Sequence, residues 1–188
     1  MTTVRRLTAF DLFSYGNINL DPLTATYYIP FYFDYFVKWP EYNSVAVAPT
    51  TGGSCAAVGG DSSIAAAYVL GKAEGEGLQW HGHVTAVTVA PEYRLLGLGS
   101  ALMDVLEAVS TEIHDAYFVD LFVRSQNKVG ISWYEKLGYS VYRRVLKYYV
   151  GPPEDDGLDM RKAMPRDKEK KSVIPFGRDV TPYEIGEY

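Results

Sequence analysis

The sequence predicts an α/β fold, a mixed and mostly antiparallel sheet with helices on both faces. Residues 81–89 alternate His81, His83 and Thr85 with smaller side chains, which is the period of a strand. Residues 101–109 place apolar side chains at helical spacing, and residues 118–123 form a short apolar run typical of a buried strand. These three patterns indicate strands with interposed helices.

The first third of the chain predicts two helices and two strands. Asp21 before Pro22 is typical of a helix start, and Pro30 repeats the proline signal before an aromatic run that ends near Trp39. Strands are expected at 44–48 and 64–71, joined by a loop of glycine, serine and alanine at 50–63.

The remainder predicts a strand at 81–89, a helix that begins at 97–100, a strand at 118–123, a further helix, and a last strand at 139–150. Ser125 is the candidate cap of the second helix, which is expected to end at Gly138. Its expected buried face holds Val129, Trp133 and Leu137. On the last strand, Tyr148 and Tyr149 are expected on opposite faces.

Length and composition indicate one domain with an appendage. The chain has 188 residues, of which 47% are hydrophobic. We expect the domain to cover residues 1–150 and residues 151–188 to form a charged tail, extended or docked on a partner, since 16 of the 41 charged residues lie there. No apolar run is long enough for a membrane span, and the single cysteine, Cys55, fits a reducing compartment, so a cytoplasmic protein is expected.

The net charge of −5 argues against a broad basic surface. The basic run at 166–171 is interleaved with Asp167 and Glu169. Direct binding of nucleic acid is therefore not expected.

The segment Arg94-Leu95-Leu96-Gly97-Leu98-Gly99-Ser100 joins a strand to a helix start. Free N–H groups and the positive end of a helix at such a junction are able to hold a phosphate. The segment lacks the Gly-Lys-Ser/Thr of a P-loop and the third glycine of a dinucleotide fold, so both are disfavoured. Taken alone, Gly97 and Gly99 would more often form a plain tight turn.

In its context this segment resembles the acetyl-CoA signature of the GNAT acetyltransferases, Gln/Arg-x-x-Gly-x-Gly/Ala directly after a central strand. Asn127 at a helix start, Tyr134 within that helix, and Leu137-Gly138-Tyr139 before the last strand resemble later features of the family. Five further segments resemble the catalytic subunits of the NatB N-terminal acetyltransferases: NINLDPLT at 17–24, WPEY at 39–42, GKAEG at 71–75, WHGHVTA at 80–86 and FVDLFVR at 118–124. Two features depart from the family: the 50–63 loop is longer, and Ala25 stands where an acidic residue is expected.

The resemblance implies a GNAT fold of about seven strands and acetyl transfer from acetyl-CoA to the α-amine of Met in Met-Asp, Met-Glu, Met-Asn and Met-Gln N-termini, by direct attack in a ternary complex. It also implies a heterodimer with a large helical-repeat auxiliary subunit, which would associate the enzyme with ribosomes and nascent chains. An aromatic helix at 31–36 with more apolar surface than a small domain buries independently indicates such a partner. No metal and no membrane association are expected.

Site residues follow from the same resemblance. The expected cofactor contacts are the backbone of Val87, Thr88 and Val89, then Arg94, Leu95, Gly97, Leu98, Gly99, Ser100, Asn127 and Tyr134. The expected catalytic groups are the Val89 N–H for the oxyanion, Tyr134 as acid for the thiolate, and Tyr148. An α-amine needs little help to lose its proton, since its ordinary pKa is about 2.5 units below that of lysine.

The expected peptide contacts are Tyr27, Phe31, His83, Thr85, Ala86, Asn127, Tyr148 and Tyr149. His83 and Thr85 would donate to the acid or amide of the second peptide residue, and a site of such donors rejects apolar residues. For Tyr134 and His83, plain packing roles stay open. A metal reading of His81 and His83 needs a third ligand, and His114 and Cys55 lie in unrelated segments.

Two other functions stay open. The chain could acetylate another N-terminal class or a small amine, for which the cofactor motif alone would suffice. It could also be an inactive CoA-binding scaffold, which Ala25 would favour.

Overall fold

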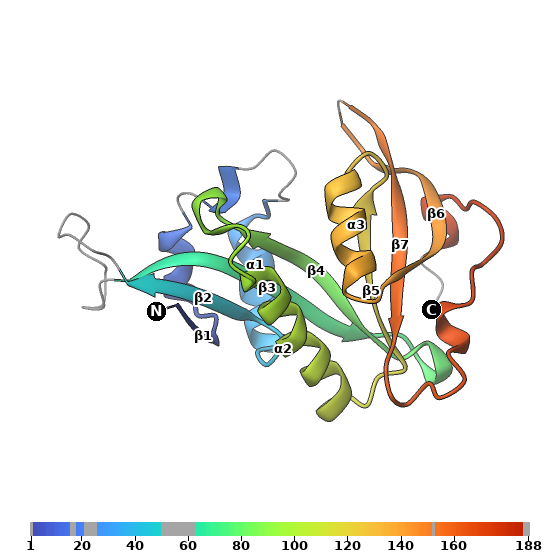
Figure 1. Ribbon diagram of the computed structural model, residues 1–188, viewed down its shortest axis with the longest axis horizontal. Helices are drawn as coiled ribbons and strands as arrows, with labels where there is room; N and C mark the ends of the chain where they lie inside the picture. Colours follow the sequence, from blue (N-terminus) through green and yellow to red (C-terminus); the bar gives the residue numbers. More distant parts are fainter. Residues whose placement is uncertain (1, 16–17, 21–25, 50–62, 152, 186–188) are drawn as a thin grey trace. The chain divides into compact units, whose positions relative to one another are not determined.

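The computed structural model describes residues 2–15, 18–20, 26–49, 63–151 and 153–185 (Figure 1). The helices are α1 (Ile29–Lys38), α2 (Leu98–Glu112) and α3 (Lys128–Lys136), and the strands are β1 (Thr3–Arg6), β2 (Ser44–Pro49), β3 (Ser63–Glu74), β4 (His81–Val89), β5 (Phe118–Arg124), β6 (Ser140–Tyr149) and β7 (Asp155–Ala163). No helix in this part of the chain is long and apolar enough to span a bilayer.

Among the described residues, seven strands form one sheet in the order β1-β2-β3-β4-β5-β7-β6. β4 and β5 pair in parallel, whereas β1 with β2, β2 with β3, β5 with β7, and β6 with β7 pair antiparallel. The expectation of a mixed, mostly antiparallel sheet is confirmed. The chain divides into two compact units, unit 1 (Met1–Lys72 and Thr85–Val109) and unit 2 (Ala73–Val84 and Ser110–Tyr188).

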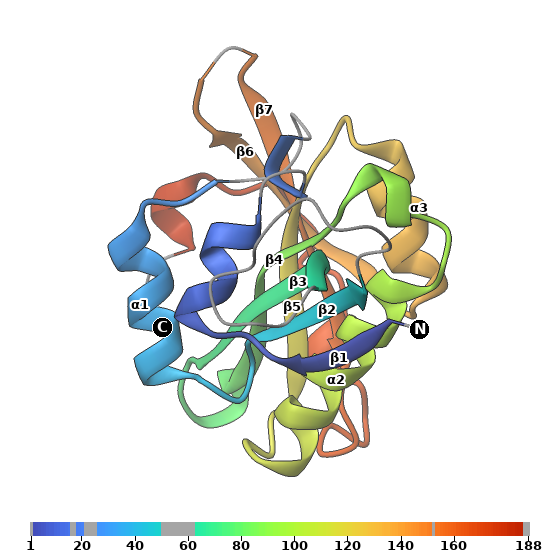
Figure 2. The same cartoon turned by 90° about the vertical axis from the view of Figure 1, so that its left-hand side faces the viewer.

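Unit 1 has an aromatic core. Tyr15 stacks on Tyr68 with ring centroids 4.5 Å apart, and α1 buries Tyr32 and Tyr35 beside them. Pro30 lies in the first turn of α1, as expected for a proline that lacks an N–H, and the helix ends at Lys38 as predicted. Figures 1 and 2 show α1 and α2 on opposite faces of the strands of this unit.

Unit 2 contains a strand that the sequence analysis missed. β7 lies between β5 and β6, and its side chains Asp159, Met160 and Arg161 are almost fully buried. The guanidinium of Arg161 lies 3.6 Å from the ring centroid of Tyr142, and its Nε donates to Asp159 at 3.3 Å. The prediction of a charged tail from residue 151 is therefore wrong for Asp155–Ala163, because paired charges and aromatic faces allow a charged sequence to be buried.

Later residues also pack against the sheet. The N–H of Phe176 donates to the Tyr142 carbonyl at 2.8 Å, and Val180 forms a parallel bridge with Val145. Val180 is itself buried. Residues 176–180 therefore follow the outer strand β6, whereas Met164 and Arg166 are bonded to the backbone of Tyr117 and Asp115.

The start of α3 differs from its prediction. Asn127 is the N-cap, since its Oδ1 accepts from the Gly130 N–H at 2.9 Å, whereas Ser125 donates to Asp155 at 2.8 Å. Val129 lies in the first turn and is 84% exposed, so its predicted burial is wrong. Trp133 and Leu137 are half-buried.

The end of β6 also differs from its prediction. Lys147 has φ of +53°, and the register with β7 shifts between Val145 and Tyr149. This bulge re-aims the following residues, so the rings of Tyr148 and Tyr149 lie 5.0 Å apart and in contact rather than on opposite faces. The expected helix start at Asp21, most of the 50–63 loop, Ala25 and Cys55 lie outside the described residues.

Candidate active site

The segment from residue 94 to residue 100, named here the phosphate loop, leads from β4 into α2. Because α2 begins at Leu98, the N–H groups of Leu98, Gly99 and Ser100 lie in its first turn, where no carbonyl of the helix accepts them. The first helical bond runs from the Ala101 N–H to the Gly97 carbonyl at 3.0 Å. Gly97 has φ of +79°, a conformation that side chains other than glycine rarely adopt.

The remaining residues of this loop suit an anionic ligand. Arg94 is exposed, and its Nε donates to the Val89 carbonyl at 3.2 Å, which holds the guanidinium beside the end of β4. Leu95 is exposed with φ of +63°. Thr88 is buried, and Val87 and Val89 are half-buried. Backbone donors, the positive helix end and one arginine form a donor set that fits a pyrophosphate.

A second group of predicted residues in unit 1 forms an aromatic cluster around Thr85. Tyr27 stacks on Phe31 with centroids 4.1 Å apart, and its hydroxyl donates to the Thr85 carbonyl at 3.2 Å. The Tyr35 hydroxyl shares a hydrogen bond of 2.8 Å with Thr85 Oγ1. Tyr35 was not among the predicted site residues, although its place one helical turn after Phe31 could have indicated it. Ala86 is half-buried against the same core.

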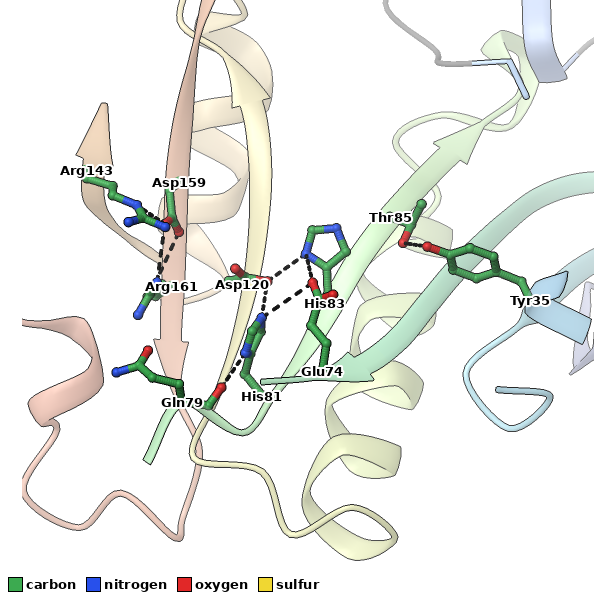
Figure 3. A network of polar contacts seen from close by, with 10 residues as sticks. All are labelled: Tyr35, Glu74, Gln79, His81, His83, Thr85, Asp120, Arg143, Asp159 and Arg161. Carbon is green, nitrogen blue, oxygen red and sulfur yellow. Dashed lines mark hydrogen bonds and ion pairs between the residues drawn. The ribbon is translucent and has the colours of Figure 1, made fainter. Parts of the chain in front are cut away.

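In unit 2, Glu74, His81, His83 and Asp120 form a histidine–carboxylate cluster (Figure 3). His83 Nδ1 lies 2.8 Å from Asp120 Oδ1, and His81 Nε2 lies 3.5 Å from the same oxygen. Glu74 Oε1 is 3.8 Å from His81 Nε2 and 3.9 Å from His83 Nδ1. The expectation that His81 and His83 share one face of β4 is confirmed, and their carboxylate partners come from β3 and β5.

Charge governs this cluster. Burial opposes ionisation of Asp120, but His81, His83 and Arg161 outweigh it and hold its pKa below the usual range. Burial and the charge of Asp120 raise the pKa of the neighbouring Asp159, while Arg161 and Arg143 oppose that rise. Asp120 is therefore the ionised carboxylate beside the two imidazoles.

The imidazole nitrogens and carboxylate oxygens of this cluster are also groups that bind metal ions. The ligand atoms of Glu74, His81 and His83 lie within 4.8 Å of one another, and imidazole with carboxylate suits a divalent cation. Glu74 supplies the third donor that the sequence analysis did not find. However, 2.8 Å between His83 Nδ1 and Asp120 Oδ1 is an ordinary hydrogen-bond length, so a proton between the two atoms satisfies both.

Four other predicted residues lie in unit 2. Asn127 uses Oδ1 for its cap, which leaves its amide N–H groups for a ligand. Burial raises the pKa of Tyr134, so its phenol keeps its proton. Tyr148 stacks on Phe122 at 4.5 Å, and the Tyr149 hydroxyl donates to the Phe122 carbonyl at 3.0 Å. The rings of Tyr148 and Tyr149 therefore lie in contact, and both tyrosines contact Phe122.

Comparison with known proteins gives one consistent result. Residues 17–139 match the acetyltransferase (GNAT) family. N-alpha-acetyltransferase 20 of Dictyostelium discoideum is 54% identical over 97% of both chains, and the N-terminal acetyltransferase B (NatB) complex catalytic subunit NAA20 of Arabidopsis thaliana is 52% identical over 98% of both. The crystal structure of Chaetomium thermophilum Naa20 with a bisubstrate analogue is 38% identical, with a TM-score of 0.84 over 98% of this chain and 100% of that one. The chain therefore belongs to the acetyltransferase (GNAT) family, and within it to the NatB catalytic subunits.

Proposed function

We propose that the chain transfers acetyl from acetyl-CoA to the α-amine of Met in N-termini that begin Met-Asp, Met-Glu, Met-Asn or Met-Gln. The observation that carries this proposal is the phosphate loop, in which Arg94 is bonded to the end of β4 and the free N–H groups of Leu98, Gly99 and Ser100 open α2. Relatives named as acetyltransferases that match nearly the whole chain support it.

The cofactor residues have distinct roles. Arg94 and the N–H groups of Gly97, Leu98, Gly99 and Ser100 hold the pyrophosphate, and the backbone of Val87, Thr88 and Val89 aligns the pantetheine. Acetyl-CoA, when bound, supplies an acyl group activated as a thioester. The Val89 N–H stabilises the oxyanion, a donor typically worth about 3–4 kcal/mol.

Tyr134 donates the proton that the departing thiolate takes up; burial raises the pKa of the phenol, so the proton is present before this step, although the same burial makes the phenol a weaker acid. Tyr148 lies near the peptide amine and takes part in removing its proton. Tyr27, Phe31, Tyr148 and Tyr149 hold the methionine side chain. His83, Thr85, Ala86 and Asn127 contact the second residue.

The partner surface lies on α1. Ile29, Phe33 and Val37 recur every four residues and are 63%, 46% and 79% exposed, so they form one apolar stripe. Tyr28, directly before α1, is also exposed, as are Phe10 and Phe13 earlier in the chain. We assign this stripe to a large helical-repeat auxiliary subunit that brings the cytoplasmic heterodimer to ribosomes and nascent chains. The Arabidopsis relative is likewise named as the catalytic subunit of a complex.

The test is acetyl transfer by the chain co-expressed with its auxiliary subunit. The peptides begin Met-Asp, Met-Leu and Ser-Glu, and a fourth has a blocked N-terminus and one lysine. Selective turnover of Met-Asp is expected. Turnover of Ser-Glu or of the lysine instead would indicate another amine, and acetyl-CoA binding without any turnover would indicate a scaffold.

A further inference from the structure

The inference concerns how Thr85 is held, and it rests on the proposed function, in which Thr85 contacts the second residue of the peptide. Thr85 is half-buried on β4. The hydroxyl of Tyr27 donates to its carbonyl at 3.2 Å. The hydroxyl of Tyr35, on α1, lies 2.8 Å from its Oγ1 (Figure 3). Two tyrosines of unit 1 therefore fix the backbone and the side chain of Thr85 separately.

Tyr35 is itself held in one place by its surroundings. Its side chain is 6% exposed, and its ring packs against the rings of Phe31 and Trp39 with centroids 4.7 and 5.3 Å away. The Tyr35 carbonyl accepts from Nδ2 of the buried Asn43 at 3.0 Å, and Oδ1 of the same amide accepts from the Gly71 N–H at 3.3 Å. Because a closely packed ring has little freedom to move, the hydroxyl of Tyr35 is a fixed point for Thr85.

The chemistry of the two hydroxyls decides which of them donates. A phenol is a stronger acid than an aliphatic alcohol, and it is a weaker acceptor because its oxygen lone pairs are delocalised into the ring. The stronger hydrogen bond therefore runs from Tyr35 to Thr85 Oγ1. Since a hydroxyl carries one proton and two lone pairs, the O–H of Thr85 is left for another acceptor. Within the described residues, Thr85 Oγ1 has no partner besides Tyr35.

An O–H donor matches what the four expected second residues share. The side chains of Asp, Glu, Asn and Gln each carry an oxygen that accepts a hydrogen bond, whereas only the two amides also donate. A donor at Thr85 thus suits all four side chains, and a leucine would leave it unpaired. An acceptor at the same place would repel the two carboxylates. The direction of the hydrogen bond between Tyr35 and Thr85 therefore bears on which peptides bind.

We propose that Tyr35 is a positioning residue for the second peptide residue: it donates to Thr85 Oγ1 and so directs the Thr85 O–H at the side-chain oxygen of Asp, Glu, Asn or Gln. The branched side chain of Thr85 restricts rotation about χ1, and the hydrogen bond from Tyr35 selects the direction of the O–H. Tyr35 acts only through Thr85. Loss of its hydroxyl lets the Thr85 O–H turn away, which weakens peptide binding and leaves the acetyl-transfer step intact.

The test measures kcat and KM of the heterodimer for peptides that begin Met-Asp, Met-Asn and Met-Leu. Tyr35→Phe removes one oxygen and keeps the ring contacts with Phe31 and Trp39. It is expected to lower kcat/KM for Met-Asp and Met-Asn about 3- to 10-fold, the range of one neutral hydrogen bond. The loss is expected in KM rather than in kcat, because binding is affected and chemistry is not. Turnover of Met-Leu is expected to stay unchanged.

A double-variant cycle shows whether Tyr35 acts through Thr85. Thr85→Val removes the hydroxyl and is expected to lower the preference for Met-Asp over Met-Leu at least as far as Tyr35→Phe does. Adding Tyr35→Phe to Thr85→Val is expected to lower it no further. Thr85→Ser keeps the hydroxyl and is expected to keep most of the preference, and to lose it when Tyr35→Phe is added.

Tyr68→Phe is the matched control. The hydroxyl of Tyr68 belongs to the same aromatic core and donates to Asn19 Oδ1 at 3.0 Å, so this variant also loses one phenol hydrogen bond. Thermal unfolding is expected to show similar losses of stability for Tyr68→Phe and Tyr35→Phe. Titration calorimetry is expected to show unchanged affinity for acetyl-CoA in both. Only Tyr35→Phe is expected to change the peptide preference.

Three results would overturn the proposal. A preference that Tyr35→Phe leaves unchanged shows that the hydroxyl only ties α1 to β4. Equal losses for Met-Asp and Met-Leu show general damage to the site. Additive losses in the double variant show that Tyr35 acts independently of Thr85. Absence of turnover of every Met peptide by the unsubstituted heterodimer contradicts the proposed function itself.

Discussion

The phosphate loop of unit 1 and the histidine–carboxylate cluster of unit 2 differ in the groups that they offer to a ligand. The loop occupies residues 94–100, is mostly exposed and offers backbone N–H groups. The cluster draws Glu74, His81, His83 and Asp120 from three strands and works through side chains. A site formed by backbone N–H groups consists of contiguous residues, so most side-chain substitutions leave it intact. A site formed by side chains from several strands depends on the pairing of those strands. The following predictions test that difference.

The largest loss of stability is expected from a substitution at Asp159, next to the histidine–carboxylate cluster. Asp159→Ala leaves Arg143 and Arg161 buried without their carboxylate, whose oxygens lie 2.8 and 3.3 Å from the two guanidinium Nε atoms. Loss of one member of a buried ion network costs about 3–5 kcal/mol of unfolding free energy. Denaturant titration measures it. Glu154→Ala, which breaks an exposed pair with Lys147, is the control and should cost less than about 1 kcal/mol.

His83→Ala is expected to lower kcat/KM for Met-Asp about 10- to 150-fold, since a hydrogen bond to a charged group contributes about 1.5–3 kcal/mol. Acetyl-CoA affinity, measured by titration calorimetry, should stay unchanged because His83 belongs to the peptide side. Equal losses of acetyl-CoA binding and turnover would instead show general structural damage.

Arg94→Ala is expected to weaken acetyl-CoA binding about tenfold, near 1.4 kcal/mol, because one exposed cation leaves while the backbone donors stay. The preference for Met-Asp over Met-Leu should not change. Arg94→Lys keeps the charge and should lose less. Unchanged affinity of Arg94→Ala by calorimetry would contradict its assignment to the pyrophosphate.

The smallest effect is expected at Gly97. A Cβ there meets open space, so the cost of Gly97→Ala is backbone strain at φ of +79°, about 1 kcal/mol. Gly97→Asn should cost less, because asparagine adopts this conformation more readily. Thermal unfolding compares the two variants, and a larger loss for asparagine than for alanine would contradict a purely conformational role.

Local patterns predicted most of the fold. β4 begins and ends where its alternation does, and α1 ends beside Trp39 as its proline and aromatic signals indicated. The strand missed was β7, whose DDGLDMRKA sequence lacks the apolar content typical of a buried strand. Its burial depends on the contacts of Asp159 with Arg143 and of Arg161 with the ring of Phe118, and both partners lie on other strands, so no window of sequence contains the signal.

The candidate site shows the same limit. The start of α2 within residues 94–100 could be predicted because these residues are contiguous, and Asn127 was correctly placed at a helix start, whereas phosphate binding by residues 94–100 stays a prediction. Asp120 and Glu74 were missed as partners of His83, since they lie 37 residues after it and 9 residues before it. The bulge at Lys147 was missed because it arises from pairing with β7, which had not been recognised.

The place of β7 between β5 and β6 also sets the order in which this part of the sheet can form during synthesis. β5 and β6 cannot join until residues 155–163 exist to lie between them, although both are synthesised earlier. During translation, the edges of β5 and β6 stay open while β7 is made, and open edges attract other strands. An enzyme proposed to modify other chains as they leave the ribosome thus completes this part of its own sheet only after β5, β6 and β7 have all been made.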